Sequence, residues 1–304
     1  MRLLVSGGTQ DPNIGHLLEG AKKRRIATST ILFGVDTHPA IHWDIQTNQM
    51  LLEGEALNPR AAFIRYDVFN HMADGREQSA FRAHAWYAAI AGWIASRADI
   101  AVLNRHGEAN VLKPEILRMA IAIGMEVPHT VVSNDVARIN RLLDGKPGNW
   151  IGKPSCGGEY TRVIEEIAGH IQQRDGAAAA PAIVQERLVS PDIRVFRVGS
   201  EFMAFSIESK HIDYRTDETC KLTRVENASK SLLQKLKRLT DRLGLDFAAA
   251  DYKICRDTGK LKFLEVNTAP MFVAFDRAGK GCITETMFRF FEANVTDTKR
   301  MKSW

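Results

Sequence analysis

Short apolar runs alternate with amphipathic helical segments through the first third of the chain. RLLVS opens the sequence, a helical segment follows over residues 17–24, and STILFGV returns to the strand pattern. IHWDIQTNQMLL then predicts two strands around a turn, AAFIRYDV predicts another strand, and residues 79–98 predict a long helix. Strands that alternate with helices in this way indicate the α/β class of folds.

The rest of the chain predicts strands and helices in a less regular order. A helix is expected from Pro114 to Ile123, ended by Gly124. NWIGKPSCGGEYTRVI predicts a strand, a glycine loop and a second strand, and ASKSLLQKLKRLTDRLGL predicts a helix. QQRDGAAAAPA is expected to be a flexible connection, because alanine and glycine supply no packed face. We expect an α/β domain over residues 1–105, a central lobe over 106–190 and a C-terminal lobe over 191–304.

The composition argues against membrane-spanning, secreted and nucleic-acid-binding proteins. The chain has 304 residues, of which 45% are hydrophobic, and a net charge of +5. No apolar run approaches the roughly 18 residues of a membrane span, and the N-terminus is too polar for a signal peptide. The basic residues are scattered, so we expect no nucleic-acid partner and no membrane, and an acidic ligand or carboxylate-bearing peptide would suit the mild positive excess. The distant cysteines suggest neither zinc nor disulfides, which favours a reduced cytoplasmic protein: Cys156, Cys220, Cys255 and Cys282.

The segment FAAADYKICRDTGKLKFLEVN predicts a hairpin that brings two carboxylates together. Asp251 and Glu265 lie at equal distances from a turn near Thr258, so they should face each other across the antiparallel pair. Adjacent carboxylates repel unless a cation lies between them, and Asn267 leaves the second strand on the same face as Glu265. An all-oxygen set of this kind suits magnesium or manganese. The alternative is that the two carboxylates face opposite sides or pair with lysines.

Other polar residues lie where a nucleotide could be held. Lys153 ends an apolar strand just before Pro154 and the glycine loop, where backbone N–H groups and a lysine can approach phosphate. IVQERL is an apolar strand with a polar end, the form of a hinge whose backbone reads an adenine edge. Arg194 and Arg215 could each hold a phosphate or a carboxylate. The alternative for each residue alone is structural: Lys153 would be a solvated lysine at a strand end, and Arg194 and Arg215 would form salt bridges.

The order of these segments resembles the ATP-grasp carboxylate ligases. K-P before a glycine pair, then V-Q-E-R-L, D-I-R-V, D-Y-R and a final D…E-V-N hairpin follow one another over about residues 100 to 295. The most similar branches are the RimK-type glutamate ligases and the graspetide macrocyclases that close ester or amide rings in microviridin-like peptides. The resemblance implies an ATP-grasp fold, in which an N-terminal α/β domain precedes two α+β lobes that clamp ATP.

The resemblance also implies a role for each matching residue. Arg215 and Arg194 would be catalytic, the first at the reacting phosphoryl and acyl groups and the second facing the phosphates. Asp251, Glu265 and Asn267 would hold Mg²⁺ or Mn²⁺, as a pair of ions. The residues expected to contact ATP are Lys113, Lys153, Gln185, Glu186, Arg187, Leu188 and Asp192.

The chain departs from the RimK branch in two places. Its glycine loop SCGGEYTRV is short and polar, and TDETCK follows Arg215 where the RimK branch has an asparagine and paired glycines. D-Y-R is closer to the D-W-R of the macrocyclases, which favours a peptide carboxylate as substrate.

The expected function is therefore ATP-dependent ester or amide formation on a peptide through an acyl phosphate. Ligation of a free amino acid or other small carboxylate, and a non-catalytic nucleotide-binding module, are the alternatives. Many relatives are dimers, so a homodimer is possible.

Overall fold

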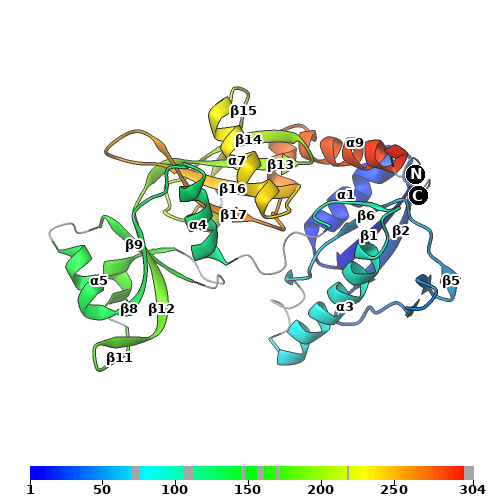
Figure 1. The fold of residues 1–304 in the computed structure, drawn as a ribbon, viewed down its shortest axis with the longest axis horizontal. Coiled ribbons are helices and arrows are strands. Elements are labelled where there is room, and N and C mark those ends of the chain that lie inside the picture. The colour runs from blue at the N-terminus through cyan, green and yellow to red at the C-terminus, as the bar shows by residue number, and fades with distance from the viewer. Residues whose placement is uncertain are drawn as a thin grey trace.

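A computed structural model describes residues 1–69, 75–105, 112–144, 148–155, 161–168, 171–217 and 219–297. Figure 1 shows three parts in a row, with the N-terminal domain at one end, the C-terminal sheet in the middle and the central lobe at the other end. No helix within these ranges is long and apolar enough to cross a lipid bilayer.

The N-terminal domain is built on a parallel sheet with the strand order β2-β1-β6-β7. Leu3 and Val5 of β1 face helix α1 and the C-terminal part of the chain, whereas Leu4 between them packs toward helix α3. Helix α1 begins earlier than the apolar pattern indicates, because Asp11 caps its N-terminus and Pro12 occupies its first turn. The elements are β1 (Arg2–Gly8), α1 (Pro12–Lys23), β2 (Ala27–Phe33), β6 (Ala61–Ile64), α3 (Glu77–Ala95) and β7 (Ala101–Val102).

A small antiparallel sheet is inserted between β2 and β6. Its strands are β3 (Ile41–Asp44), β4 (Gln49–Leu52) and β5 (Glu55–Ala56), in that order. The expected strand–turn–strand reading of IHWDIQTNQMLL is confirmed, with Trp43 opposite Met50. Met50 is fully buried and joins the core under α3, so this sheet is anchored to the domain.

The central lobe is a five-stranded sheet with helices α5 and α6. Strand β12 is its centre and pairs with β9, β8 and β11. Its hydrophobic cluster includes Ile139, Trp150, Ile164 and Val184. The elements are β8 (Thr130–Asp135), α5 (Val136–Leu143), β9 (Trp150–Pro154), β10 (Arg162–Val163), α6 (Ile164–Ala168), β11 (Gln173–Arg174) and β12 (Ala177–Glu186).

The expectation of a flexible connection at QQRDGAAAAPA is wrong. The segment forms a hairpin, in which β11 pairs with the first residues of β12. Asp175 and Gly176 both have positive φ, 52° and 79°, as a tight two-residue hairpin turn requires. The alanines then extend the strand, and since they are intermediate or exposed, none of them needs a packed face.

The C-terminal lobe is a five-stranded sheet with the order β15-β14-β13-β16-β17. One face packs against helices α4 and α7, and the other against α8, α9 and the N-terminal domain. Val195 and Phe196, neighbours on β13, lie on these opposite faces. The elements are α4 (Lys113–Ala122), β13 (Val189–Val198), β14 (Glu201–Glu208), the 3-10 helix η1 (Tyr214–Thr216), β15 (Lys221–Val225), α7 (Lys230–Arg242), β16 (Phe247–Ile254), β17 (Leu261–Asn267), α8 (Val273–Ala278) and α9 (Cys282–Asp297).

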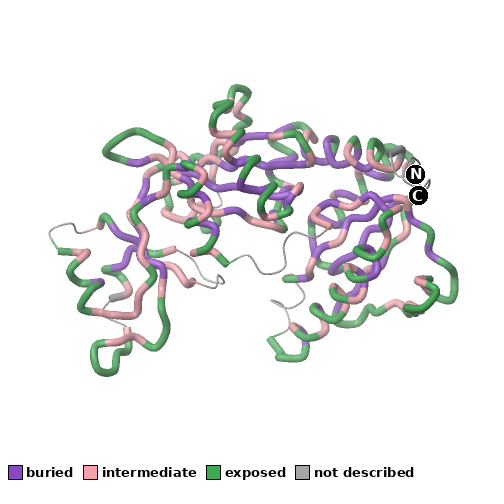
Figure 2. Tube along the Cα trace, in the orientation of Figure 1, coloured by how far each residue is buried: buried purple, intermediate pink, exposed green. Residues whose placement is uncertain are grey.

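The N-terminal domain and the C-terminal lobe share one hydrophobic core. Figure 2 shows buried segments along the strands of both parts, and Phe63 of β6 contacts the rings of Phe247 and Phe272 edge to face. Helix α4 also packs in the core of the C-terminal lobe, although it lies before the central lobe in sequence. The division at residues 105 and 190 stays a prediction.

Buried polar contacts hold the loop after β17 to the N-terminal domain. Arg65 is 4% exposed, donates to Asp11 at 2.7 Å, and donates to the carbonyl oxygens of Ala269 and Pro270. Asn104 donates to the carbonyl of Thr268 in the same loop. The N-terminal domain therefore fixes the chain directly after the β16–β17 hairpin.

Candidate active site

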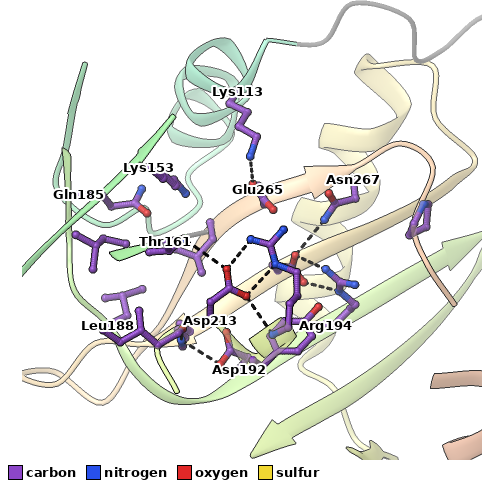
Figure 3. A pocket seen from close by; sticks show the side chains of 18 of the residues that line it. Lys113, Lys153, Thr161, Gln185, Leu188, Asp192, Arg194, Asp213, Glu265 and Asn267 are labelled. Carbon is purple, nitrogen blue, oxygen red and sulfur yellow. Dashed lines mark hydrogen bonds and ion pairs between the residues drawn. The ribbon is translucent and has the colours of Figure 1, made fainter. Parts of the chain in front are cut away.

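A cavity of about 370 Å³ lies between the sheet of the central lobe and the sheet of the C-terminal lobe. Strands β9 and β12 line it from one side, and β13, β16, β17 and η1 line it from the other (Figure 3). Every residue that the sequence singled out for a site borders this cavity: Lys113, Lys153, Gln185, Glu186, Arg187, Leu188, Asp192, Arg194, Arg215, Asp251, Glu265 and Asn267.

The two carboxylates expected on the hairpin face each other. Asp251 is paired with Glu265 across β16 and β17, which confirms the predicted register. A bulge follows directly, because Tyr252 pairs with Phe263 and leaves Leu264 without an opposite residue. Asn267 lies on the same face, and its amide nitrogen donates to Asp251 Oδ2 at 3.0 Å.

Asp251 is paired with Arg194 in the neighbouring strand β13. Arg194 Nε lies 2.6 Å from Oδ1 and Nη2 lies 2.7 Å from Oδ2, so both carboxylate oxygens are bound. Burial alone would lower the pKa of Arg194, but the charge and hydrogen bonds of Asp251 outweigh it and raise that pKa. The Arg194 guanidinium therefore binds the Asp251 carboxylate at the border of the cavity, and its expected role toward phosphates stays a prediction.

Glu265 is bound by a lysine from helix α4. Lys113 Nζ lies 2.9 Å from Glu265 Oε2. Burial raises the pKa of Glu265, yet the positive charges of Lys113 and Lys153 outweigh burial and hold that pKa below its usual value. The Lys113 side chain therefore already neutralises one of the two facing carboxylates.

Lys153 lies at the end of β9 beside this group. Burial lowers the pKa of its ammonium, and Glu265 offsets only part of that shift. Within the described parts of the chain, no carboxylate lies within ion-pairing distance of Lys153 Nζ. A partly buried ammonium without an ion-pair partner favours an anionic ligand in the cavity.

Residues 185–188 form the hinge between the two sheets, and their charged side chains bond to other groups of the protein. Lys262 donates to both oxygens of Glu186, at 2.7 and 2.9 Å, and Arg187 donates to the carbonyl of Gly148 at 3.2 Å. Gln185 and Leu188, in contrast, are buried against the cavity. The hinge therefore presents a carboxamide and an apolar wall to a bound molecule.

The remaining candidates lie on the C-terminal side. Burial raises the pKa of Asp192 to about 6, against the charge of Lys253 at 3.1 Å. Arg215 is half exposed and donates to Asp213 at 2.8 and 2.5 Å, an acceptor two residues before it in sequence. Its guanidinium therefore belongs to the lining of the same cavity as Lys153.

Solved structures with the same arrangement identify the fold. No protein-family model and no curated protein sequence matches this chain. The ATP-grasp ligase PsnB, complexed with a phosphomimetic variant of minimal precursor, Mg and ADP, aligns with a TM-score of 0.75 and 23% identity, over 95% of this chain and 98% of that one. The macrocyclase MdnC from Microcystis aeruginosa MRC, bound with precursor peptide MdnA, gives a TM-score of 0.72 and 16% identity over 96% and 99%. A Chryseobacterium gregarium RiPP-associated ATP-grasp ligase, in complex with ADP and a leader and core peptide, gives 0.66 and 17% over 94% and 95%.

The chain has the ATP-grasp fold. This confirms the α/β class and the two clamping lobes expected from the sequence. The cavity lies where the two lobes of the ATP-grasp fold face each other, as Figures 1 and 3 together show.

The residues present fit a divalent cation in this ATP-grasp cavity. Asp251, Glu265 and Asn267 supply oxygen donors from one face of one hairpin, the donor type that Mg²⁺ and Mn²⁺ prefer. Arg194 and Lys113 at present compensate the two negative charges. A metal at this position would have to replace part of that compensation.

Two cavity residues received no role in the sequence interpretation, although one of them, Asp213, begins the D-Y-R motif. Lys253 lies two residues after Asp251, so strand alternation could have placed it on the same face. Asp213 accepts from the backbone N–H of Thr161 at 3.4 Å and so links the two lobes; no local pattern marks that contact. The phosphate contacts expected from the glycine loop fall on residues 156–160, outside the described residues.

Proposed function

We propose that this chain is an ATP-dependent ligase that activates a peptide carboxylate as an acyl phosphate and joins it to an amine or a hydroxyl. The observation that carries the proposal is the cavity of about 370 Å³, where an ammonium, a carboxylate pair and a hinge converge in an ATP-grasp fold. Lys153 supplies the ammonium, and Asp251 and Glu265 the carboxylates.

The proposed reaction has two displacements. An oxygen of the substrate carboxylate attacks the γ-phosphorus of ATP, the bond from that phosphorus to the β-bridging oxygen breaks, and ADP leaves. The amine or hydroxyl then attacks the acyl carbon, the carbon–oxygen bond to phosphate breaks, and the nucleophile's proton passes to solvent. Each step brings anionic groups together, so the catalyst must mainly neutralise charge.

The side chains of the cavity support this division of work. Lys153 would bind ATP phosphates from the end of β9, and Arg215, half exposed in the cavity lining, would act on charge that develops between ATP and the substrate. Asp251, Glu265 and Asn267 would hold a divalent cation, which would supply positive charge to neutralise the phosphates. We assign Arg194 to holding Asp251 in place within this set.

Two observations support a peptide as the substrate. PsnB, MdnC and the C. gregarium ligase are described with precursor or core peptides. A second cavity of about 280 Å³ lies at the carboxyl ends of β6 and β7 and shares Ala269 with the first, which leaves room for an acceptor beside the nucleotide. We further propose that the enzyme works in the cytoplasm, where its free thiols would stay reduced.

The test uses ATP, Mg²⁺ and the peptide encoded beside the gene, preferably one with a repeated acidic core. Phosphorus NMR is expected to show ADP and orthophosphate, and mass spectrometry a product lighter by one water for each bond formed. Release of AMP and pyrophosphate would refute the acyl-phosphate route. ATP consumption with a free amino acid, but with no peptide, would assign the enzyme to small substrates.

A further inference from the structure

The second cavity lies beside the candidate active site, on the side of the N-terminal domain. The carboxyl ends of β6 and β7, helix α3 and the loop after β17 border it. Ala269 is exposed and lines both cavities, two residues after Asn267. A peptide that enters the active-site cavity past Ala269 can therefore place a neighbouring side chain in the second cavity.

The charged and amide side chains among the described residues of this lining are bound within the protein. Arg65 uses Nε on Asp11 and both Nη groups on carbonyl oxygens of the loop after β17. Asn104 uses both ends of its carboxamide on backbone groups of residues 246–247 and 268. Arg105 donates to three carbonyl oxygens at the C-terminal end of α3, those of Ile94, Arg97 and Ile100. These polar side chains therefore form the frame of the cavity.

The rest of the lining is mainly apolar and aromatic. Phe63 and Phe247 meet edge to face with ring centroids 5.9 Å apart, and Tyr66 and Tyr87 meet in the same way at 5.9 Å. Aromatic rings favour such contacts, so a third ring can extend either pair. The volume of about 280 Å³ is below the roughly 300–1,000 Å³ of pockets for drug-sized ligands. The cavity therefore suits one large side chain better than a whole cofactor.

The charge around the cavity opposes a basic occupant. Two guanidinium groups border it, and in the described parts of the chain Arg65 forms an ion pair with Asp11 whereas Arg105 forms none. A lysine ammonium would meet like charge, and the nearby carbonyl oxygens already accept from the arginines. An aromatic side chain needs no polar partner, and a guanidinium attracts the face of a ring.

We propose that the second cavity binds an aromatic side chain of the peptide substrate, next to the residue that reacts, and so selects the substrate by its sequence. The inference rests on the proposed function for the identity of the occupant, because a peptide is expected there only if the enzyme acts on one. The reacting carboxylate, and a lysine that served as nucleophile, would stay in the first cavity.

The first test uses probes that need no ATP. The N-acetyl amides of phenylalanine, lysine and glutamate each carry one side chain between two peptide groups, and ligand-observed NMR titration measures their affinities. The phenylalanine amide is expected to bind at least about tenfold more tightly than the other two, the effect of burying one large apolar side chain. Tighter binding of the lysine or glutamate amide, or binding of none of the three, would overturn the inference.

Two variants locate the binding in this cavity. Ala91 is half-buried on α3 and lines the cavity, so Ala91→Phe should fill it and weaken the phenylalanine amide at least about tenfold. Ala85→Phe, at an exposed position of the same helix outside the lining, is the matched control and should bind like wild type. Tyr87→Ala removes one ring of an aromatic pair and should weaken binding severalfold, which keeps the test decisive if Ala91→Phe fails to fold. Wild-type affinity in Tyr87→Ala would place the binding elsewhere and refute the proposal.

The second test links the cavity to catalysis. Each aromatic residue of the peptide substrate is changed in turn to alanine, and one change should raise KM at least about tenfold with kcat nearly unchanged. The same change should have little further effect in Ala91→Phe. A substrate without an aromatic residue, or one whose aromatic residues leave KM unchanged, would overturn the inference while the ligase proposal stands. If the phenylalanine amide binds but no peptide supports ADP formation, the proposed function fails, and the assignment of the occupant as substrate fails with it.

Discussion

Arg194 binds both oxygens of Asp251, at 2.6 and 2.7 Å, within the sheet of the C-terminal lobe. The two side chains are about 10% exposed, and they come from directly paired positions on β13 and β16. One of the carboxylates proposed to bind metal is thus held in place by a cation of the protein itself. A buried pair of this kind is strongly destabilised when one partner is removed, because the other charge is left uncompensated.

Arg194→Met should therefore destabilise the protein in a metal-dependent manner. In the presence of EDTA we expect a loss of about 3–5 kcal/mol in the free energy of unfolding. Mg²⁺ with ADP should restore more stability to Arg194→Met than to wild type, because the ion would compensate Asp251. Urea denaturation under both conditions measures this. The double variant Arg194→Met/Asp251→Asn should regain stability without metal, and equal responses of single variant and wild type to Mg²⁺ would contradict a shared role for Asp251.

Glu265→Gln should abolish turnover and leave the fold intact. The amide keeps the shape of the side chain and can still accept from Lys113, but it removes the negative charge that faces Asp251. We expect ADP formation to fall at least a hundredfold, on the order of the loss of one electrostatic element of a transition state. Melting temperatures check the fold. Glu126→Gln, at an exposed ion pair with Lys260, is the control, and near-normal turnover of Glu265→Gln would make Glu265 a structural residue.

Lys153→Ala should lose mainly ATP affinity, whereas Arg215→Ala should lose mainly the rate of the chemical step. Lys153 is partly buried and has no ion-pair partner in the described structure, so its removal should weaken ATP binding by roughly 1.5–3 kcal/mol, the value of a charge-assisted hydrogen bond. Arg215 is half exposed and held by Asp213, so its removal should leave ATP affinity nearly unchanged and slow the chemical step about a hundredfold. Calorimetry and single-turnover kinetics measure the two effects. Equal losses of ATP affinity would show that the roles are assigned wrongly.

ATP affinity should also decrease as pH rises, and the decrease should begin at a lower pH than it would if Lys153 had the pKa of an exposed lysine. Burial lowers the pKa of Lys153 in the free protein, whereas bound phosphates would favour its charged form and raise that pKa again. Between these two pKa values, ATP binding must take up a proton, and affinity must decrease as pH rises. Calorimetry in buffers of different ionisation enthalpy measures the proton uptake. Lys153→Met should remove it, and persistent uptake in that variant would assign the proton to another group.

The hairpin at the centre of the site could be predicted from the sequence alone. The turn near Thr258 and Gly259 is local, so counting outward from it placed Asp251 opposite Glu265, as the structure confirms. The same local reasoning fails at residues 172–182, because the alanine run predicts no packed strand although the Asp175–Gly176 turn directly before it closes a hairpin. Turn residues were the more informative signal at both places.

The partners of the carboxylates could not be predicted in this way. Arg194 meets Asp251 only because β13 pairs with β16, and Lys113 meets Glu265 only because α4 packs against β17. Both contacts join segments far apart in the sequence, and no pattern within either segment specifies the other. The resemblance to a family brought these residues to one site, but their pairing is a property of the folded sheet.

The buried contacts of the loop after β17 limit how the N-terminal domain can be exchanged between such enzymes. Arg65 holds Ala269 and Pro270, Asn104 holds Thr268, and Asn13 accepts from the backbone N–H of Phe272. A chimera that replaced residues 1–105 to change acceptor preference would remove these anchors from a segment that starts one residue after Asn267. Transplanting the N-terminal domain alone should therefore impair the metal site, whereas a graft that retains Asp11, Asn13, Arg65 and Asn104 should preserve it.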